Sequence, residues 1–229
     1  MRNAPCGQSD CPIVDPSTID RRRLKTHNLL PGAEYFRATR REYSHQAFTP
    51  GVGNGRFSPL TGRSHLYMAE QRSAALLESA LHEADGPNPR IYQHTLAAYE
   101  LHRIRFGAGL VLIDLRDEAL ATLGLDRGQL TGAGPRHYRC TQQVAEYIAG
   151  SKRSAGLLWT SRQGTLHAQR NQDGLAAEVL RHQSLDVAVV YSPDHSAPID
   201  IIGSEPLLTD GKATRFVTEL ANLLQIAIL

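Results

Sequence analysis

The segment QRSAALLESALHEA, residues 71–84, constrains the fold of this chain more than any other feature. Its apolar residues recur three and four positions apart, which places them on one face of a helix. These residues are Ala74, Leu77, Leu81 and Ala84. An apolar segment typical of a short strand, residues 65–69, comes just before it. A helix with one apolar face must bury that face on another layer, so helix and sheet are expected to pack together.

The other apolar segments are mostly short and are separated by turn residues. We expect strands at residues 34–40, 65–69, 98–106, 110–115, 156–161, 187–191 and 199–203. Further helices are expected at residues 117–123, 141–149 and 214–226. Only Gly107-Ala108-Gly109 separates the strands at 98–106 and 110–115, which predicts that these two strands pair. With no internal repeat and no clear linker, the pattern indicates a single mixed α+β domain.

Three regions fall outside this pattern. Residues 1–30 carry three prolines and the basic run Arg21-Arg22-Arg23, so we expect a loosely ordered N-terminal segment there. A folded domain should then cover residues 31–229. Residues 41–64 are rich in Gly, Pro, Ser and Thr and predict a long loop, which in compact domains is often functional.

Composition excludes several classes of protein. Of 229 residues, 41% are hydrophobic, enough to build a core. No segment approaches the roughly 20 apolar residues of a transmembrane helix, and the N-terminus has no apolar leader segment. The formal charge of +2 is too small for a protein that binds nucleic acid mainly through phosphate contacts. We therefore expect a cytoplasmic protein that contacts neither membranes nor nucleic acids.

The metal-binding residue types give no clear signal. Cys6 and Cys11 lie in the N-terminal segment and Cys140 in an expected helix. An odd number of cysteines without a repeated pair spacing favours neither a disulfide framework nor a zinc site. The ten histidines are scattered, and no phosphate-binding loop, dinucleotide fingerprint or metal helix is present. We expect no metal in the mechanism.

Four polar residues stand out because their neighbours are apolar or glycine-rich. They are Arg56, Tyr67, Glu78 and Ser161. Each also has a structural explanation: an arginine paired with a surface carboxylate, a core tyrosine, a glutamate on the polar flank of its helix, and a serine that caps the next segment. From the residues alone, both interpretations stay open.

In their order along the chain, these segments resemble the RES-domain family, bacterial toxin-like proteins named for an Arg, a Glu and a Ser. The matching segments are Phe36-Arg37, Gly55-Arg56-Phe57-Ser58-Pro59, Leu66-Tyr67-Met68-Ala69, Ala74 to Glu78 with His82 beyond it, Tyr99–Phe106, Ile113-Asp114-Leu115 and Thr160-Ser161. The resemblance covers roughly residues 33–161. Phe57 stands where the family commonly has Trp, and Thr160 stands where it usually has Pro. Residues 162–229 match the family only loosely and form an extended C-terminal part.

The resemblance implies a fold like the catalytic domains of ADP-ribosylating toxins, diphtheria toxin among them, in which two small sheets form a cleft that clamps NAD. It implies catalytic roles for Arg56, Tyr67, Glu78 and Ser161, and NAD-binding roles for Arg37, Phe57, Ser58 and His82. NAD would be the substrate rather than a cofactor, and inorganic phosphate a possible co-substrate. The expected partner is a cognate antitoxin, or an immunity protein, that blocks the cleft.

The function that follows is a toxin that depletes NAD by cleaving its nicotinamide–ribose bond, as a phosphorylase or a glycohydrolase. One alternative is a transferase that moves ADP-ribose onto a protein. Transferases of this fold often carry Glu or Gln two residues before the catalytic Glu, where this chain has Leu76. A second alternative is a binding module whose catalytic site has decayed.

Overall fold

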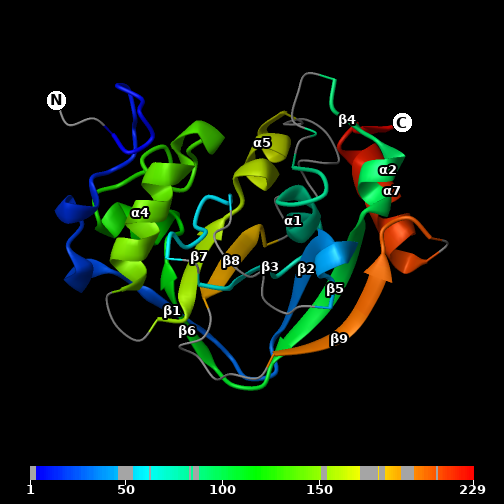
Figure 1. The fold of residues 1–229 in the computed structure, drawn as a ribbon, viewed down its shortest axis with the longest axis horizontal. Helices are drawn as coiled ribbons and strands as arrows, with labels where there is room; N and C mark the ends of the chain where they lie inside the picture. The colour runs from blue at the N-terminus through cyan, green and yellow to red at the C-terminus, as the bar shows by residue number, and fades with distance from the viewer. Residues whose placement is uncertain are drawn as a thin grey trace.

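Two bent segments, residues 26–40 and 99–114, run antiparallel to each other and organise the sheet. β1 (Thr26–Leu29) pairs with β6 (Leu110–Asp114), and beyond the bend β2 (Glu34–Arg40) pairs with β5 (Tyr99–Phe106). We call this pair of segments the bent ribbon. In Figure 1 it lies at the base of the molecule, and it has two arms, β1 with β6 and β2 with β5, one in each half.

The computed structural model describes residues 4–45, 54–61, 63–82, 84, 88–150, 154–170, 180, 184–191, 199–209 and 211–229. They form one mixed eight-stranded sheet in the order β1-β6-β7-β8-β3-β2-β5-β9. Its other strands are β3 (His65–Ala69), β7 (Gly156–Thr160), β8 (Asp186–Tyr191) and β9 (Ile199–Pro206). A separate parallel pair joins β4 (Arg90–Ile91) to β10 (Ala227–Ile228). All seven strands predicted from the sequence are present.

Glycines form the bend of the ribbon. Gly32 has a φ of +78°, and its N–H donates to the carbonyl of Phe106 at 2.8 Å. A Cβ at Gly109 would lie 3.2 Å from the carbonyl oxygen of Leu29, so the two bent segments approach closely there. The predicted pairing of residues 98–106 with 110–115 is therefore wrong. The three-residue link is a bend, and each strand continues beside the other long segment instead.

The expectation of a loosely ordered segment over residues 1–30 is wrong for residues 26–29, which form the edge strand β1. Two short 3₁₀ helices precede it, η1 (Pro16–Thr18) and η2 (Arg21–Arg23). The guanidinium carbon of Arg21 lies 3.7 Å from the centre of the Tyr147 ring, so part of the basic run packs on the domain. Within the predicted loop 41–64, residues 41–43 form η3 (Arg41–Tyr43), and residues 46–53 and 62 lie outside the described part.

The longer helices cover the two halves of the sheet. Between β6 and β7, which are parallel, the chain forms α3 (Asp117–Thr122), η4 (Pro135–His137) and α4 (Tyr138–Ala149). α5 (Arg162–Arg170) follows β7. α4 packs against β7, whereas α2 (Gln93–Ala97) packs against β5 and α7 (Lys212–Leu223) against β9. The predicted helices at 117–123, 141–149 and 214–226 are thus confirmed.

The helix predicted over residues 71–84 is much shorter than expected. α1 ends after one and a half turns, at Arg72–Leu77, and Glu78 is its C-cap residue. The hydroxyl of Ser79 donates to the carbonyl of Ala75, and the N–H of Leu81 donates to the carbonyl of Leu76 at 2.8 Å. These bonds close the helix as a C-terminal turn. Because α1 ends at Leu77, Glu78 does not lie on the polar flank of a regular helix.

β3 contributes to two separate cores because its side chains alternate. Leu66 and Met68 pack in a cluster with residues of the ribbon, such as Phe106. Tyr67 and Ala69 point to the opposite face, where the helices pack. This alternation places the Tyr67 ring on the side of α1 rather than in the inner core.

The sheet is weakest between β3 and β2. β3 pairs with β8 over five residues, whereas β2 and β3 share the single register pair Phe36↔Ala69. The expected arrangement of two small sheets is therefore replaced by one continuous sheet whose halves separate at this junction. In Figure 1, β3 runs across the molecule while β2 runs along the right arm of the ribbon.

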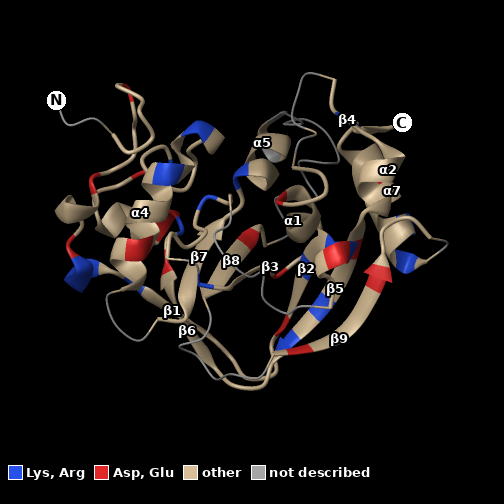
Figure 2. Cartoon of the chain, in the orientation of Figure 1, with Lys and Arg blue, Asp and Glu red and all other residues tan. Residues whose placement is uncertain are grey.

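Charged residues recur along β2, β5 and β9 in the right half of the molecule (Figure 2). Glu34 on β2 bonds Arg105 at 2.5 Å and lies 3.7 Å from Arg103, both on β5. Exposed pairs of this kind contribute little to stability but keep the outer face hydrated. None of the described helices has the length and apolar character needed to cross a bilayer.

We predict that Gly156→Ala destabilises the fold strongly. A Cβ at Gly156, on β7 between β6 and β8, would lie 1.8 Å from the carbonyl oxygen of Val189, so the strands must separate. We expect a loss of about 3 kcal/mol or more in the free energy of unfolding, measured in urea. Gly134→Ala is the matched control, because nothing lies within 4 Å of a Cβ there. Equal stabilities of the two variants would contradict this packing.

Candidate active site

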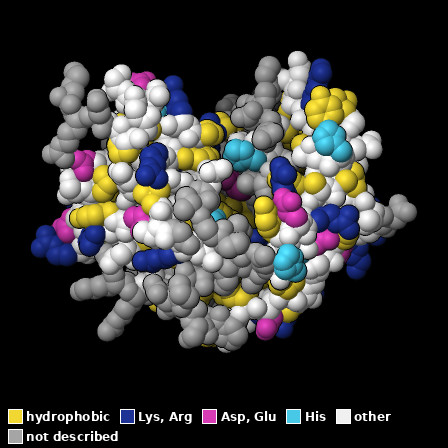
Figure 3. Space-filling view, in the orientation of Figure 1, with side chains coloured by type: hydrophobic (Ala, Val, Ile, Leu, Met, Phe, Trp, Pro, Cys, Tyr) yellow, Lys and Arg dark blue, Asp and Glu magenta, His cyan; other side chains and the backbone are white. Residues whose placement is uncertain are grey.

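A cavity of about 510 Å³ lies where β2 and β3 separate. Arg37 of β2, Tyr67 of β3 and Glu78 after α1 line it together with Arg56 and Trp159. Figure 3 shows the molecule hollowed at the middle of this face, between its two halves. Cavities that hold small molecules in proteins usually measure about 300–1,000 Å³, so this one is large enough for a substrate.

Glu78 is held from outside the cavity by the start of α5. Its Oε1 accepts a hydrogen bond from the Ser161 hydroxyl at 2.6 Å and lies 3.4 Å from the backbone N–H of Gln163. Among the described residues, Oε2 has no hydrogen-bond partner. One carboxylate oxygen is thus fixed by the protein, and the other is left for a ligand.

Ser161 has two structural contacts and no place in the cavity lining. It is fully buried, and its hydroxyl accepts from the N–H of Gly164 at 2.9 Å, which caps the first turn of α5. It donates at the same time to Glu78. The capping interpretation of Ser161 is therefore correct, and Ser161 is connected to the cavity through its hydrogen bond to Glu78 rather than by lining it.

A tight turn brings the Gly-Arg-Phe segment against Tyr67. The N–H of Phe57 donates to the Tyr67 hydroxyl at 3.0 Å, and the N–H of Gly55 donates to the Ser58 hydroxyl at 3.0 Å. A Cβ at Gly55 would lie 2.7 Å from the Tyr67 hydroxyl, so only glycine fits. Burial raises the pKa of Tyr67, which keeps the hydroxyl protonated.

Arg56 is a buried cation at the rim of this turn. It is 5% exposed, and no carboxylate of the described residues lies within ion-pair distance. Its guanidinium donates to the carbonyl of Ala133, and its carbon lies 5.2 Å from the centre of the Tyr138 ring. Pairing with a surface carboxylate is therefore wrong for Arg56. A buried cation compensated only by dipoles and a ring favours an anionic ligand.

Arg37 adds a second buried guanidinium to the lining. It is 5% exposed, and burial lowers its pKa to about 10, so it remains charged. His65 lies close enough for Arg37 to affect it, and burial lowers the pKa of His65 to about 4. At neutral pH the polar wall thus carries two cations and a neutral histidine.

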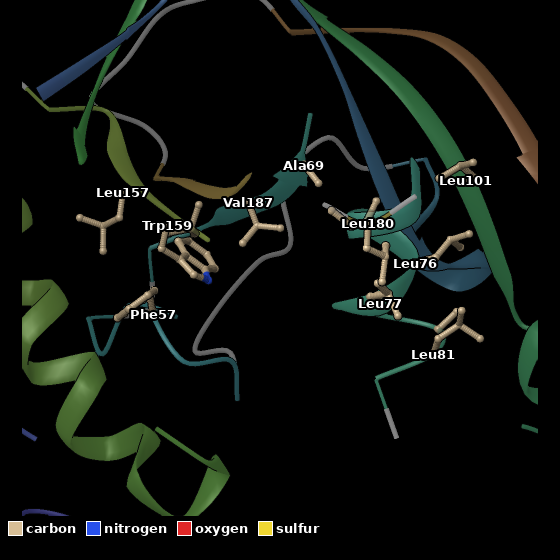
Figure 4. Close-up of a cluster of buried hydrophobic side chains, with 14 of the residues drawn as sticks. Phe57, Ala69, Leu76, Leu77, Leu81, Leu101, Leu157, Trp159, Leu180 and Val187 are labelled. Atoms are coloured by element: carbon tan, nitrogen blue, oxygen red, sulfur yellow. The ribbon is translucent and has the colours of Figure 1, made fainter. Parts of the chain in front are cut away.

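The other predicted binding residues have different positions. Ser58 and His82 line the cavity, as expected. Phe57 does not: it is fully buried in the core, with its ring 4.9 Å from that of Trp159 (Figure 4). The structure thus places the Phe57 ring against Trp159 in the core rather than at the cavity surface, where the resemblance led us to expect it. The hydrophobic environment of Phe57 explains why an aromatic residue is needed there.

Trp159 is a lining residue that the sequence reasoning missed. Its ring lies edge-on to Phe57 and, at 6.0 Å, to Tyr67. Its buried indole N–H has no hydrogen-bond partner among the described residues. A buried donor without an acceptor costs free energy, which a ligand oxygen would recover. The signal was the only tryptophan of the chain at the end of an otherwise apolar strand, two residues before Ser161.

The residues around the cavity all fall within the part of the chain that matches a known protein family. A model of the RES domain matches residues 34–188, which is more than half of the chain. The chain belongs to the RES domain family. The match includes every candidate residue described above and reaches β8, beyond the residue 161 at which the sequence resemblance was expected to end.

This RES domain is also similar in fold to a solved structure, that of the MbcT–MbcA toxin–antitoxin complex of M. tuberculosis. The two chains are 17% identical, with a TM-score of 0.56, and the match covers 90% of this chain and 98% of the other. At that identity the likeness concerns the fold. A comparison with curated proteins gave no match.

We predict a stability loss at acid pH that depends on His65. The unfolded chain takes up a proton near pH 6.5, whereas the folded protein does so only near pH 4. Between these values the free energy of unfolding should fall by about 3 kcal/mol as the pH drops. His65→Gln should remove this part of the slope in urea unfolding curves. His94→Gln, at an exposed histidine of α2, should leave it unchanged. A slope in His65→Gln equal to that of the wild type would contradict the assignment.

Proposed function

We propose that this RES domain cleaves the bond between nicotinamide and ribose in NAD and acts as the toxin of a toxin–antitoxin pair. The single observation that supports this most is the half-satisfied carboxylate of Glu78 in a cavity that also contains buried cations. NAD presents the matching groups: an anionic pyrophosphate and a ribose that becomes positively charged as nicotinamide leaves.

Glu78 would stabilise the reacting ribose. Breaking the glycosidic bond gives the ribose oxocarbenium character, and the electron pair of the bond goes to the pyridinium nitrogen of nicotinamide. Oε1 is fixed by Ser161, so Oε2 can meet the ribose 2′-hydroxyl and the developing charge. No covalent intermediate with the enzyme is required, because nicotinamide is already a good leaving group.

The buried arginines support phosphate as well as water as the acceptor. Arg56 and Arg37 can bind the pyrophosphate of NAD or an incoming inorganic phosphate through paired hydrogen bonds. In phosphorolysis a phosphate oxygen forms the new bond to the ribose carbon as the bond to nicotinamide breaks. In hydrolysis a water oxygen takes that place and loses a proton. A requirement for phosphate in the assay would distinguish the two.

Transfer of ADP-ribose to a protein is less well supported. Leu76 occupies the position where transferases of this fold often carry a polar residue, and it is fully buried in the core around α1. No polar group at that position can therefore orient an acceptor side chain. A labelled protein band after incubation of a lysate with labelled NAD would favour transfer, and intact NAD would favour a decayed binding module.

The partner we propose is an antitoxin that covers the cavity, by analogy with the toxin–antitoxin complex that shares this fold. The substrate places the activity in the cytoplasm, where NAD is abundant. Growth arrest on expression, relieved by the cognate antitoxin, is the expected cellular behaviour.

Glu78→Gln tests the proposal most directly. The variant keeps the size and hydrogen-bonding capacity of the side chain and removes its charge, so turnover of NAD should fall about 10²–10³-fold. KM should change much less, because ground-state NAD carries little additional charge at that carbon. Purified protein is assayed for nicotinamide release with and without phosphate. Glu219→Gln, exposed on α7, is the control and should retain full turnover. A folded Glu78→Gln protein with normal turnover would remove Glu78 from the mechanism.

Ser161→Ala tests the positioning role. Without the hydroxyl, Glu78 loses its shortest hydrogen bond and α5 loses a cap. We expect kcat to fall about 10–100-fold with little change in KM, together with about 1 kcal/mol of stability. Asp15→Ala removes a similar cap at η1 and should lose stability but no activity. If Ser161→Ala and Asp15→Ala both lost stability and both kept full activity, Ser161 would only cap the helix.

A further inference from the structure

The three cysteines of the chain meet at one point, although they are far apart in the sequence. The sulfur atoms of Cys6, Cys11 and Cys140 all lie within 4.8 Å of one another, and none forms a disulfide. Cys140 lies in the first turn of α4 and is buried, whereas Cys6 and Cys11 belong to the N-terminal segment. His137, three residues before Cys140, is also buried and faces Cys6.

We propose that Cys6, Cys11, Cys140 and His137 bind one structural Zn²⁺ ion. Three thiolates and one imidazole are a common ligand set of structural zinc sites. The separation of Cys6 from Cys11 by four residues is also typical of zinc ligands on one segment. The cysteine spacing alone did not favour a zinc site, so the proposal depends on the three-dimensional cluster, and it is independent of the proposed NAD chemistry.

Two ligand pairs are at the distances expected for tetrahedral coordination, whereas His137 lies outside the group of ligand atoms that are all within 4.8 Å of one another and must move toward the other sulfurs on binding. With Zn–S bonds of about 2.3 Å, two sulfurs of a tetrahedral site are about 3.8 Å apart, and a sulfur and an imidazole nitrogen are about 3.6 Å apart. Cys11 Sγ lies 3.6 Å from Cys140 Sγ, and Cys6 Sγ lies 3.6 Å from His137 Nδ1. Both observed pairs are therefore within a few tenths of an ångström of the edges of such a site.

The N-terminal segment has little else to hold it in place. None of residues 4–12 is buried, so this segment adds no side chain to the apolar core. Its side-chain contacts across the chain all reach one turn of η4 and α4. These contacts are Cys6 with His137, Cys11 with Cys140, and Asp10 with Arg136. Thiols are weak hydrogen-bond partners and Asp10 and Arg136 are exposed, so a metal ion accounts best for the convergence.

His137 would bind through Nδ1, the nitrogen that faces Cys6. Its Nε2 now accepts from Arg136 Nε at 2.9 Å. Metal binding at Nδ1 places the imidazole proton on Nε2, so Arg136 must give way to an acceptor such as water or a carboxylate. The Arg136 side chain is 65% exposed and can rotate into solvent, which frees the space beside His137 Nε2 for that acceptor.

The proposal is tested on the full chain by metal content and cobalt spectroscopy. Protein purified without chelator should contain about one zinc ion per chain by plasma mass spectrometry. Exchange for Co²⁺ should give the intense visible bands of tetrahedral cobalt and a thiolate-to-cobalt charge-transfer band. Cys140→Ser and Cys6→Ser should each lose the zinc and melt at a lower temperature. Ser9→Ala, exposed between the two N-terminal cysteines, should keep the zinc and the melting temperature of the wild type.

Three results would overturn the proposal. The first is wild-type protein without zinc that gives no cobalt bands. The second is a protein lighter by two hydrogens because Cys11 and Cys140 form a disulfide. The third is zinc that stays at full occupancy in both cysteine variants. An unchanged cobalt spectrum in His137→Ala would overturn the assignment of the fourth ligand. These measurements do not involve NAD, so they succeed or fail independently of the catalytic proposal.

Discussion

The cavity of this RES domain exists because β2 and β3 part after a single register pair. A sheet that continued to pair in this register would set Ala38 opposite Tyr67 and Arg37 opposite Met68, and would leave no room for a ligand between the two strands. Instead, β3 pairs with β8 and β2 pairs with β5, and the short helix α1 packs beside the junction. The bend of the ribbon at Gly32 and Gly109 makes this possible, because it lets one pair of segments serve both halves of the sheet.

The end of α1 and the end of β7 meet at Glu78. The helix before it ends early, and the strand after which Ser161 lies supplies the hydroxyl that holds it. This partly buried carboxylate is held through one oxygen, and no cation of the described residues pairs with it. Partly buried charges without a charged partner are typical of sites shaped by binding or catalysis rather than by stability. The buried guanidinium of Arg56, 5% exposed, presents the same situation with the opposite charge.

Local patterns predicted the elements well and their partners poorly. The alternation in EYFRATR and the apolar run of GLLWT identified β2 and β7, because these signals depend only on neighbouring residues. The bent ribbon could not be predicted in the same way, since Gly107-Ala108-Gly109 is compatible with both a hairpin and a bend. The NAD-binding role of Phe57 followed from the family resemblance alone, and no local pattern indicates that its ring packs on Trp159. The cysteine cluster was missed because Cys11 and Cys140 are 129 residues apart, and their chemistry depends on that long-range contact.

The proposed zinc site and the candidate active site share α4. Thr141 donates to the carbonyl of Arg56 at 2.6 Å, and Gln142 donates to the carbonyl of Gly55 at 3.0 Å. Both donors follow directly after Cys140, so the same helical turn binds the N-terminal segment on one side and holds the Arg56 turn on the other. The same turn begins with Tyr138, whose ring lies against the Arg56 guanidinium. A short helix end fixed by a metal moves less than one held by thiols and water. The metal would therefore stabilise the position of Arg56 without contacting the substrate, through the hydrogen bonds that α4 makes with the turn.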